Sequence, residues 1–231
     1  MRLIFVRHGE PDYDNDCLTE NGRIQAKSTA ERLKNENIKA IFSSPMGRAR
    51  ETASYTAKNY GLEVKILDFM HEINWGSQND TEKLKYDGHP WTLANELLTK
   101  NPEYVGSADW INHPYFKNNL CMKYYEKISK GFDEFLSGFG LIRKNGLYRC
   151  EKSNDDTIAL FAHGGSGGIM FSHVLNLPLP FAFTTMPYGV CSVSIIDFTP
   201  ENGNMVIPRL ELFNDMNHIE SFKLEKIHFE K

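Results

Sequence analysis

Short apolar runs alternate with helical stretches at both ends of this 231-residue chain. The runs are of strand length and lie at 2–6, 38–44, 63–67 and 157–162. Strands buried in a parallel sheet are short and uniformly apolar, and helices connect them. The alternation therefore predicts an α/β fold, a three-layer α/β/α sandwich with a mostly parallel central sheet.

Local signals set the expected ends of the helices. Thr19 precedes a stretch with helical spacing of small and apolar residues, so we expect it to cap a helix over about 20–35. Ser44 followed by Pro45 predicts the start of a second helix, with the serine as N-cap. Gly61 is suited to the C-terminal cap of that helix.

The strand pattern lapses between about 73 and 156, a stretch that holds all three tryptophans. We expect a mainly helical insertion over the C-terminal edge of the strands, within a single domain spanning 1–231. Two further stretches rich in β-forming residues, 190–198 and 206–213, are expected to be strands. Pro208 lacks a backbone N–H, so the last stretch is expected at a sheet edge.

Composition excludes several classes of partner. The net charge is −4 and no basic block occurs, which argues against nucleic acid. No run of 18 apolar residues occurs, so no membrane span is expected. The apolar stretch at the N-terminus is too short, and followed too early by charged residues, to be a signal peptide. The four cysteines are scattered without a C-x-x-C pair. A cytoplasmic location without disulfides or a zinc site is therefore predicted.

Reactive side chains follow four of the predicted strands. Arg7 and His8 leave the first, and Arg48 lies in the first turns of the helix after the second. Glu72 follows the third strand, and His163 follows the fourth directly. Because ligands bind at the carboxyl ends of parallel strands, we expect these side chains to converge at one edge.

The convergent set favours a phosphoryl group as its ligand. Two guanidiniums and free helix N-termini bind phosphate oxygens, and Gly164 lets the backbone approach an anion closely. A metal ion would require carboxylates or thiolates near the histidines and would be repelled by the arginines. Each residue alone is more often an ordinary surface group, so the prediction rests on their joint placement. No metal and no cofactor are predicted.

The ordered motifs resemble those of the histidine phosphatase superfamily, in the branch that includes cofactor-dependent phosphoglycerate mutases. They are "RHGE" (7–10), "LTENG" (18–22), "SSPMGRARETA" (43–53), the glutamate of "HEINWG" and "AHGG" (162–165). The likeness covers about 1–76 and 157–200. The family usually places a glycine and then an aromatic residue after the glutamate, whereas here Trp75 precedes Gly76. His71 is adjacent to Glu72. Glu82 is an alternative candidate for the glutamate of this motif.

The resemblance implies a role for each residue. His8 would attack phosphorus and carry the phosphoryl group as a phosphohistidine. Glu72 would protonate the leaving oxygen and then activate water. His163 would take part in catalysis and, with Arg7, Arg48 and Gly164, would bind the phosphoryl oxygens. Arg50 is expected to be structural or peripheral.

The sequence favours hydrolysis over intramolecular transfer. A mutase of this family has a longer loop after the first motif, and here Asp12, Asp14 and Asp16 crowd that short stretch. Three carboxylates there would repel a second anionic group, although they are as consistent with a solvated turn. A metal-independent phosphomonoester hydrolase acting on a small phosphorylated metabolite is therefore predicted.

Alternatives stay open at this point. They are a cofactor-dependent phosphoglycerate mutase, a phospholigand-binding or interaction module of the same fold, and, less favoured, a metal-dependent hydrolase. Five aromatic residues are candidates for a pocket around the leaving group, namely Tyr13, Trp75, Tyr86, Trp91 and Tyr188. A homodimer is the base-rate expectation for the oligomeric state.

Overall fold

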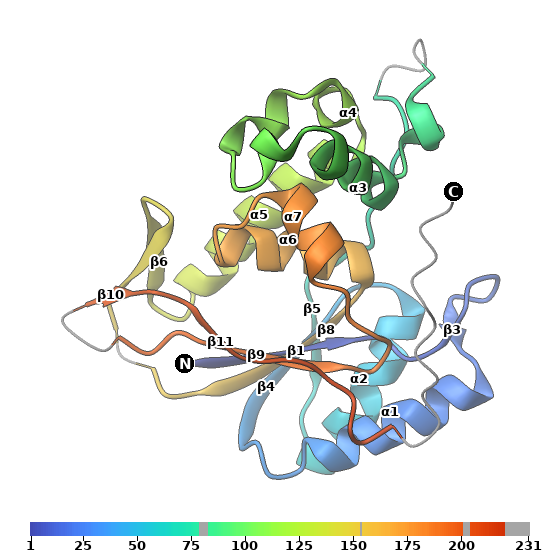
Figure 1. Ribbon diagram of the computed structural model, residues 1–231. Helices are drawn as coiled ribbons and strands as arrows, with labels where there is room; N and C mark the ends of the chain where they lie inside the picture. The colour runs from blue at the N-terminus through green and yellow to red at the C-terminus, as the bar shows by residue number, and fades with distance from the viewer. Residues whose placement is uncertain (79–82, 153, 201–203, 220–231) are drawn as a thin grey trace. The chain divides into compact units, whose positions relative to one another are not determined.

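The computed structural model describes residues 1–78, 83–152, 154–200 and 204–219. The chain divides into two compact units (Figure 1). The first contains Met1–Glu72, Asp133–Gly167 and the described residues from Tyr188 onward. The second contains Ile73–Phe132 and Gly168–Pro187. The stretch expected as an insertion, 73–156, is thus shared between the two units.

A six-stranded mixed sheet forms the centre of the first unit. Its strands, in spatial order, are β11 (Arg209–Asp215), β9 (Val193–Asp197), β1 (Arg2–Arg7), β8 (Thr157–Ala162), β4 (Ile38–Ser43) and β5 (Val64–Ile66). β1, β8, β4 and β5 pair in parallel, whereas β9 runs antiparallel to β1 and to β11. The prediction of an α/β fold with a mostly parallel sheet is confirmed.

The register of β8 decides where the strands end. Arg7 of β1 lies opposite Ala162 of β8, and Ser43 of β4 lies opposite Phe161. The three parallel strands therefore end within one residue of each other. The residues that follow them start from the same edge of the sheet.

Two helices lie on the same side of this sheet, α1 (Glu20–Arg32) and α2 (Gly47–Tyr60) (Figure 1). Thr19 caps α1 as predicted, because its Oγ1 accepts a hydrogen bond from Gly22 N–H. Gly61 caps α2 in the left-handed conformation, also as predicted. The expected start of α2 is wrong: its N-cap is Met46. Ser44 instead prolongs the β4 ladder, since its N–H donates to Phe161 O.

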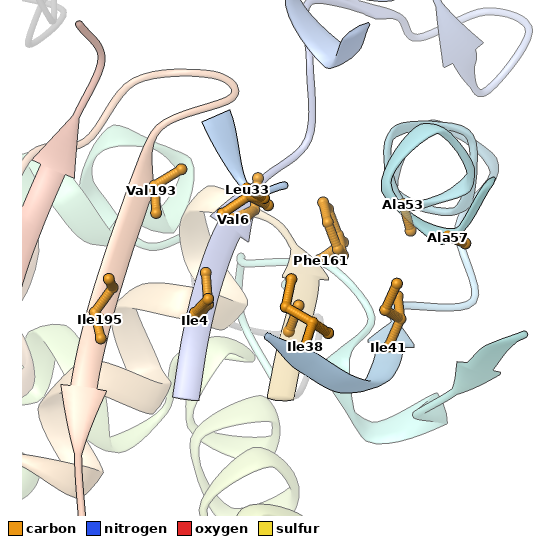
Figure 2. Packing of buried hydrophobic residues seen from close by; sticks show 11 residues of the cluster. Ile4, Val6, Leu33, Ile38, Ile41, Ala53, Ala57, Phe161, Val193 and Ile195 are labelled. Atoms are coloured by element: carbon orange, nitrogen blue, oxygen red, sulfur yellow. The ribbon is translucent and has the colours of Figure 1, made fainter. Parts of the chain in front are cut away.

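Alternate residues of the strands form a core on that side of the sheet, and Figure 2 shows this cluster. Ile4 and Phe161 are fully buried in it, and α2 contributes Ala53 and Ala57. The small alanines let the helix lie close to the strands. Aromatic side chains also pack on the opposite face. The rings of Phe42 of β4 and Phe135 meet edge-on, with their centroids 4.8 Å apart.

A β-hairpin lies inside the stretch expected to be helical. β6 (Leu141–Lys144) and β7 (Leu147–Cys150) pair antiparallel, and β10 (Met205–Val206) adds to β7. Asn145 and Gly146 both have positive φ, 52° and 82°. Asn-Gly between two short strands is a strong hairpin signal, which identifies the hairpin from the sequence in retrospect.

The C-terminal strands partly match their prediction. The stretch 206–213 forms β11 and the end of β10, with Pro208 between the two strands. β11 lies at an edge of the sheet, as expected. A short ladder of β2 (Pro11–Asp12) and β3 (Cys17–Leu18) frames the acidic loop after the first strand.

The second unit is mainly helical. Its helices are α3 (Pro90–Lys100), α4 (Pro114–Lys117) and α7 (Leu179–Thr185). Short 3-10 turns lie at Lys85–Gly88, Pro102–Tyr104 and Ala108–Asn112. One more 3-10 turn, Asp68–Met70, belongs to the first unit. α5 (Cys121–Ser137) and α6 (Gly164–Val174) each have one part in either unit. Within the second unit, Trp91 of α3 stacks on Phe183 of α7 with ring centroids 4.6 Å apart. No helix in the described parts of the chain is long and apolar enough to cross a membrane.

Shortening Ile4 to alanine should lower the free energy of unfolding by about 2–5 kcal/mol, because it leaves a cavity in the core of the sheet. Urea denaturation followed by circular dichroism measures this change. Ile24→Ala is the matched control, since Ile24 is 57% exposed on α1. That control should change stability by about 0.5 kcal/mol or less. Equal losses in the two variants would contradict the placement of the core.

Candidate active site

The two histidines predicted to act together lie side by side at the sheet edge. His8 N–H donates to Ala162 O, which prolongs the β1–β8 ladder by one residue. His163 follows Ala162 directly, and the ring centroids of His8 and His163 are 5.1 Å apart. Both side chains are buried. The register of the parallel strands thus produces this pair.

The His8 ring is held with one nitrogen available for attack. Its Nδ1 lies 2.7 Å from Gly9 O, and because a carbonyl oxygen only accepts, Nδ1 carries the hydrogen. Nε2 therefore has its lone pair and accepts a long hydrogen bond of 3.4 Å from Arg48 Nε. Burial, and then the charges of Arg7 and Arg48, lower the pKa of His8 to about 3. The imidazole is thus neutral at physiological pH.

Arg7 has one donor that no described residue accepts. Its Nη1 donates to Tyr188 O at 2.8 Å. Its guanidinium lies close to Gly164, where a Cβ would stand 3.6 Å from Arg7 Cζ. Nε of Arg7 is buried and has no hydrogen-bond partner among the described residues. An acceptor from outside the protein would satisfy this N–H.

His163 has a similar free donor. Its Nε2 lies 2.6 Å from Ser44 Oγ, which also accepts a hydrogen bond from Met46 N–H. If the Ser44 hydroxyl donates to Nε2, the ring hydrogen of His163 is on Nδ1. Within the described residues, that buried Nδ1 has no partner. Burial lowers the pKa of His163, and the neighbouring His8 and Arg48 lower it further, so this ring is also neutral.

Arg48 is buried in the first turn of α2, with 4% of its surface exposed. Its Nη1 donates to Asp16 Oδ1 at 2.7 Å. Thr52 joins this turn to the first loop, because its hydroxyl donates to Arg48 O and accepts from Gly9 N–H. Tyr13, which is 69% exposed, lies against the guanidinium, with its ring centroid 5.3 Å from Arg48 Cζ.

Glu72 reaches the same edge of the sheet from the turn after β5. Its carboxylate accepts hydrogen bonds from Gly165 N–H and Ser166 N–H, each at 3.0 Å. These groups belong to the first turn of α6, two and three residues after His163. The Glu72 carboxyl group thus accepts from two of the free N–H groups at the start of this helix. Glu82, the alternative candidate for the glutamate at this position, lies outside the described residues.

Tyr188 supports the site from within the protein. It is 8% exposed, and its hydroxyl donates to Gly164 O at 2.6 Å. Trp75, Tyr86 and Trp91 belong to the second unit. Tyr86 donates to the buried Glu96 carboxylate there, so its hydroxyl has a structural partner.

The structure thus brings together the main predicted site residues, Arg7, His8, Arg48, Glu72, His163 and Gly164. Arg50 is exposed, as expected for a peripheral residue. Sequence reasoning missed the contacts of Ser44, Thr52 and Asp16. Ser44 lay within a recognised motif and only its role was misassigned. Nothing local to the sequence indicates the other two contacts.

Metal-binding residues do not gather elsewhere in the described chain. Within residues 1–78, 83–152, 154–200 and 204–219, no group of three or more His, Cys, Asp or Glu side chains is arranged to hold an ion. The nearest charged neighbours of His8 are two arginines. The donor set around His8 therefore suits an anion.

Comparison with known proteins identifies the family. The model of the histidine phosphatase superfamily (branch 1) matches residues 3–103. A probable phosphoglycerate mutase, GpmB, of Escherichia fergusonii is 32% identical over 238 aligned positions, which cover 98% of this chain and 99% of that protein. The chain belongs to the histidine phosphatase superfamily. The resemblance seen in the ordered motifs is confirmed.

Two further similarities concern phosphatases. Phosphoserine phosphatase 1 of Hydrogenobacter thermophilus is 30% identical over 124 residues, which is 50% of this chain and 53% of that protein. The crystal structure of phosphoserine phosphatase from Entamoeba histolytica, in complex with 3-phosphoglyceric acid, matches with a TM-score of 0.62. It is 20% identical and the match covers 94% of this chain and 98% of that chain, which shows a shared fold.

The buried neutral His8 should make stability depend on pH. Its pKa of about 3 in the folded state lies below the ordinary value of 6.5, so the unfolded state binds more protons between these values. Stability is therefore lost as pH falls below about 6.5. Between pH 7.5 and 5 this group should cost about 2 kcal/mol of unfolding free energy.

Urea denaturation at the two pH values, for the wild type and for His8→Gln, checks this expectation. The variant should lose about 2 kcal/mol less than the wild type when pH is lowered. An identical pH dependence in both proteins would show that His8 is not held neutral.

Proposed function

We propose that this protein is a metal-independent phosphomonoester hydrolase that acts on a small phosphorylated metabolite through a phosphohistidine at His8. One observation carries the proposal: a neutral buried imidazole stands beside two buried donors that have no acceptor in the described protein. These donors are Arg7 Nε and His163 Nδ1. A phosphoryl group supplies both an electrophile for His8 Nε2 and acceptor oxygens for the two donors.

In the first step, His8 Nε2 attacks phosphorus and the bond from phosphorus to the ester oxygen breaks. Arg7, Arg48 and His163 bind the three remaining oxygens and stabilise the charge that spreads over them. Glu72 gives its proton to the leaving oxygen, which departs as an alcohol. The Arg7 guanidinium lies next to Gly164, at the start of α6.

In the second step, water attacks phosphorus and the bond between phosphorus and Nε2 breaks. Glu72, now a carboxylate, takes a proton from that water, and inorganic phosphate leaves. His8 returns to the neutral form with its hydrogen on Nδ1, because Gly9 O holds that tautomer throughout. The cycle needs no oxidant, reductant or further cofactor.

The mutase is the second candidate, favoured by the full-length likeness to a probable phosphoglycerate mutase. That reaction would need a site for a second anionic group beside the phosphohistidine. Asp14 is exposed and Asp16 binds Arg48, so the loop after the first motif adds negative charge beside the anion site. This charge favours hydrolysis of a monophosphate. The presence of Arg7, His8, Arg48 and His163 together argues against a module that only binds a phosphorylated ligand.

The finer features of the proposal follow from chemistry and similarity. The names of the relatives point to small phosphorylated hydroxy acids or amino acids as the substrate class. We place the enzyme in the cytoplasm, in keeping with four cysteines that are all free thiols. A homodimer stays a prediction.

Replacing His8 with alanine should abolish phosphate release, because the variant lacks the imidazole that attacks phosphorus in the proposed mechanism. The assay compares wild type and variant on p-nitrophenyl phosphate, phosphoserine, 3-phosphoglycerate with its bisphosphate cofactor, and common sugar and nucleoside monophosphates, all with excess EDTA. Isomerisation of phosphoglycerate without phosphate release would identify a mutase. Appreciable hydrolysis by the variant, or loss of wild-type activity in EDTA, would contradict the proposal.

Arg48→Ala should cost about 3 kcal/mol or more in kcat/KM, roughly a hundredfold or greater loss, because a preorganised donor to the transition state disappears. Arg50→Ala is the matched control. It removes the same group from an exposed position on the same helix, and its kcat/KM should stay within about twofold of the wild type. Similar losses in both variants would mean that Arg48 has no special place at the site.

A further inference from the structure

Asp16 connects the acidic loop to the start of α2. Its Oδ1 accepts a hydrogen bond from Arg48 Nη1 at 2.7 Å, and its Oδ2 accepts one from Gly47 N–H at 2.6 Å. The Asp16 side chain is 42% exposed and that of Arg48 is 5% exposed. A partly solvated carboxylate thus holds a buried guanidinium and the first N–H of the helix at once.

The loop is shaped for this contact. Asp16 has a φ of +46°, in the left-handed region, which aspartate adopts more readily than most residues other than glycine. Asp12 folds the preceding turn, because its side chain accepts from the backbone N–H groups of Asp14 and Asn15. Gly47 lets the loop touch the helix, since a Cβ there would lie 2.1 Å from Asp16 O.

The helix itself provides no substitute for Asp16. Met46 is the N-cap of α2 and makes no side-chain capping bond, so Asp16 supplies the cap from another part of the chain. Burial alone would raise the pKa of Asp16, but the hydrogen bonds from Gly47 and Arg48 outweigh it and lower the pKa. The group is therefore an anion at neutral pH.

The contact fixes the orientation of the phosphate-binding arginine. With Nη1 bound to Asp16, the guanidinium directs Nε at His8 Nε2, 3.4 Å away. A guanidinium is planar, so fixing two of its nitrogens fixes the third. We propose that Asp16 is a positioning residue, which holds Arg48 in the orientation required by the phosphoryl group during transfer. This inference rests on the proposed phosphoryl transfer at His8.

The charge of Asp16 gives the proposal a distinctive signature. A carboxylate beside an anion site weakens binding of phosphate by simple repulsion. Removing it without any change in Arg48 would therefore tighten phosphate binding and leave kcat unchanged. If Asp16 positions Arg48, its removal lowers kcat instead, because the transition state loses an aligned donor.

The test uses Asp16→Ala, Asp16→Asn and Asp14→Asn in the full-length protein. With p-nitrophenyl phosphate, Asp16→Ala should lower kcat about thirtyfold or more. Asp16→Asn keeps one acceptor for Arg48 and should recover most of that loss. Asp14→Asn removes the same charge from the same loop without touching Arg48, and should stay within about twofold of the wild type. Thermal melting confirms that each variant is folded.

A double-mutant cycle shows whether Asp16 acts through Arg48. Adding Asp16→Ala to Arg48→Ala should cause little further loss of kcat, because the group being positioned is already absent. Calorimetric titration with inorganic phosphate repeats the cycle without turnover. An additive loss, an unchanged kcat in Asp16→Ala, or an equal loss in Asp14→Asn would overturn the proposal.

The same measurements separate this proposal from the proposed function. If the wild type binds phosphate but shows no His8-dependent hydrolysis, the proposed function fails. The phosphate titrations alone then decide whether Asp16 and Arg48 are coupled. If hydrolysis depends on His8 and the cycle is additive, only the role of Asp16 is wrong.

Discussion

The parallel pairing of β8 with both β1 and β4 is the interaction on which the rest of this structure depends. It brings the ends of three strands within one residue of each other, so that His8, Ser44 and His163 begin at the same edge. A shift of one residue would turn every side chain of β8 to the opposite face. In the observed register, Ala159 and Phe161 of β8 pack in the apolar cluster on the α1 and α2 side, so one register sets both this core and the geometry of the site.

Electrostatics then give the site its character. Two imidazoles are buried beside two arginines, and this combination keeps both rings neutral. The carbonyl partner of His8 Nδ1 sets its tautomer and leaves a lone pair on Nε2, whereas one nitrogen of His163 meets the Ser44 hydroxyl, which can donate or accept. Under the proposed mechanism, neither imidazole has to gain or lose a proton before His8 attacks phosphorus.

The α/β fold and most of the site residues could be predicted from the sequence, because the patterns that indicate them are local or depend on position relative to the strands. Apolar runs, the Thr19 and Gly61 caps and the residues at strand ends gave the α/β fold and the members of the site. The role of Ser44 could not be predicted, because the Ser-Pro pair is a strong helix signal and its contact with His163 spans 119 residues. The hairpin at 141–150 was missed because its Asn-Gly turn lies in a stretch assigned to helix.

The unsatisfied donors of Arg7 and His163 also affect how the protein behaves when it is not turning over. Buried N–H groups that have no acceptor among the described residues cost free energy in the folded protein. Any oxyanion that fills them binds the folded state alone, so it stabilises that state by mass action. Under the proposed function inorganic phosphate is the product, so we expect it both to inhibit the enzyme and to stabilise this fold. The donors that would bind the substrate would then lower the stability of the fold until an anion binds.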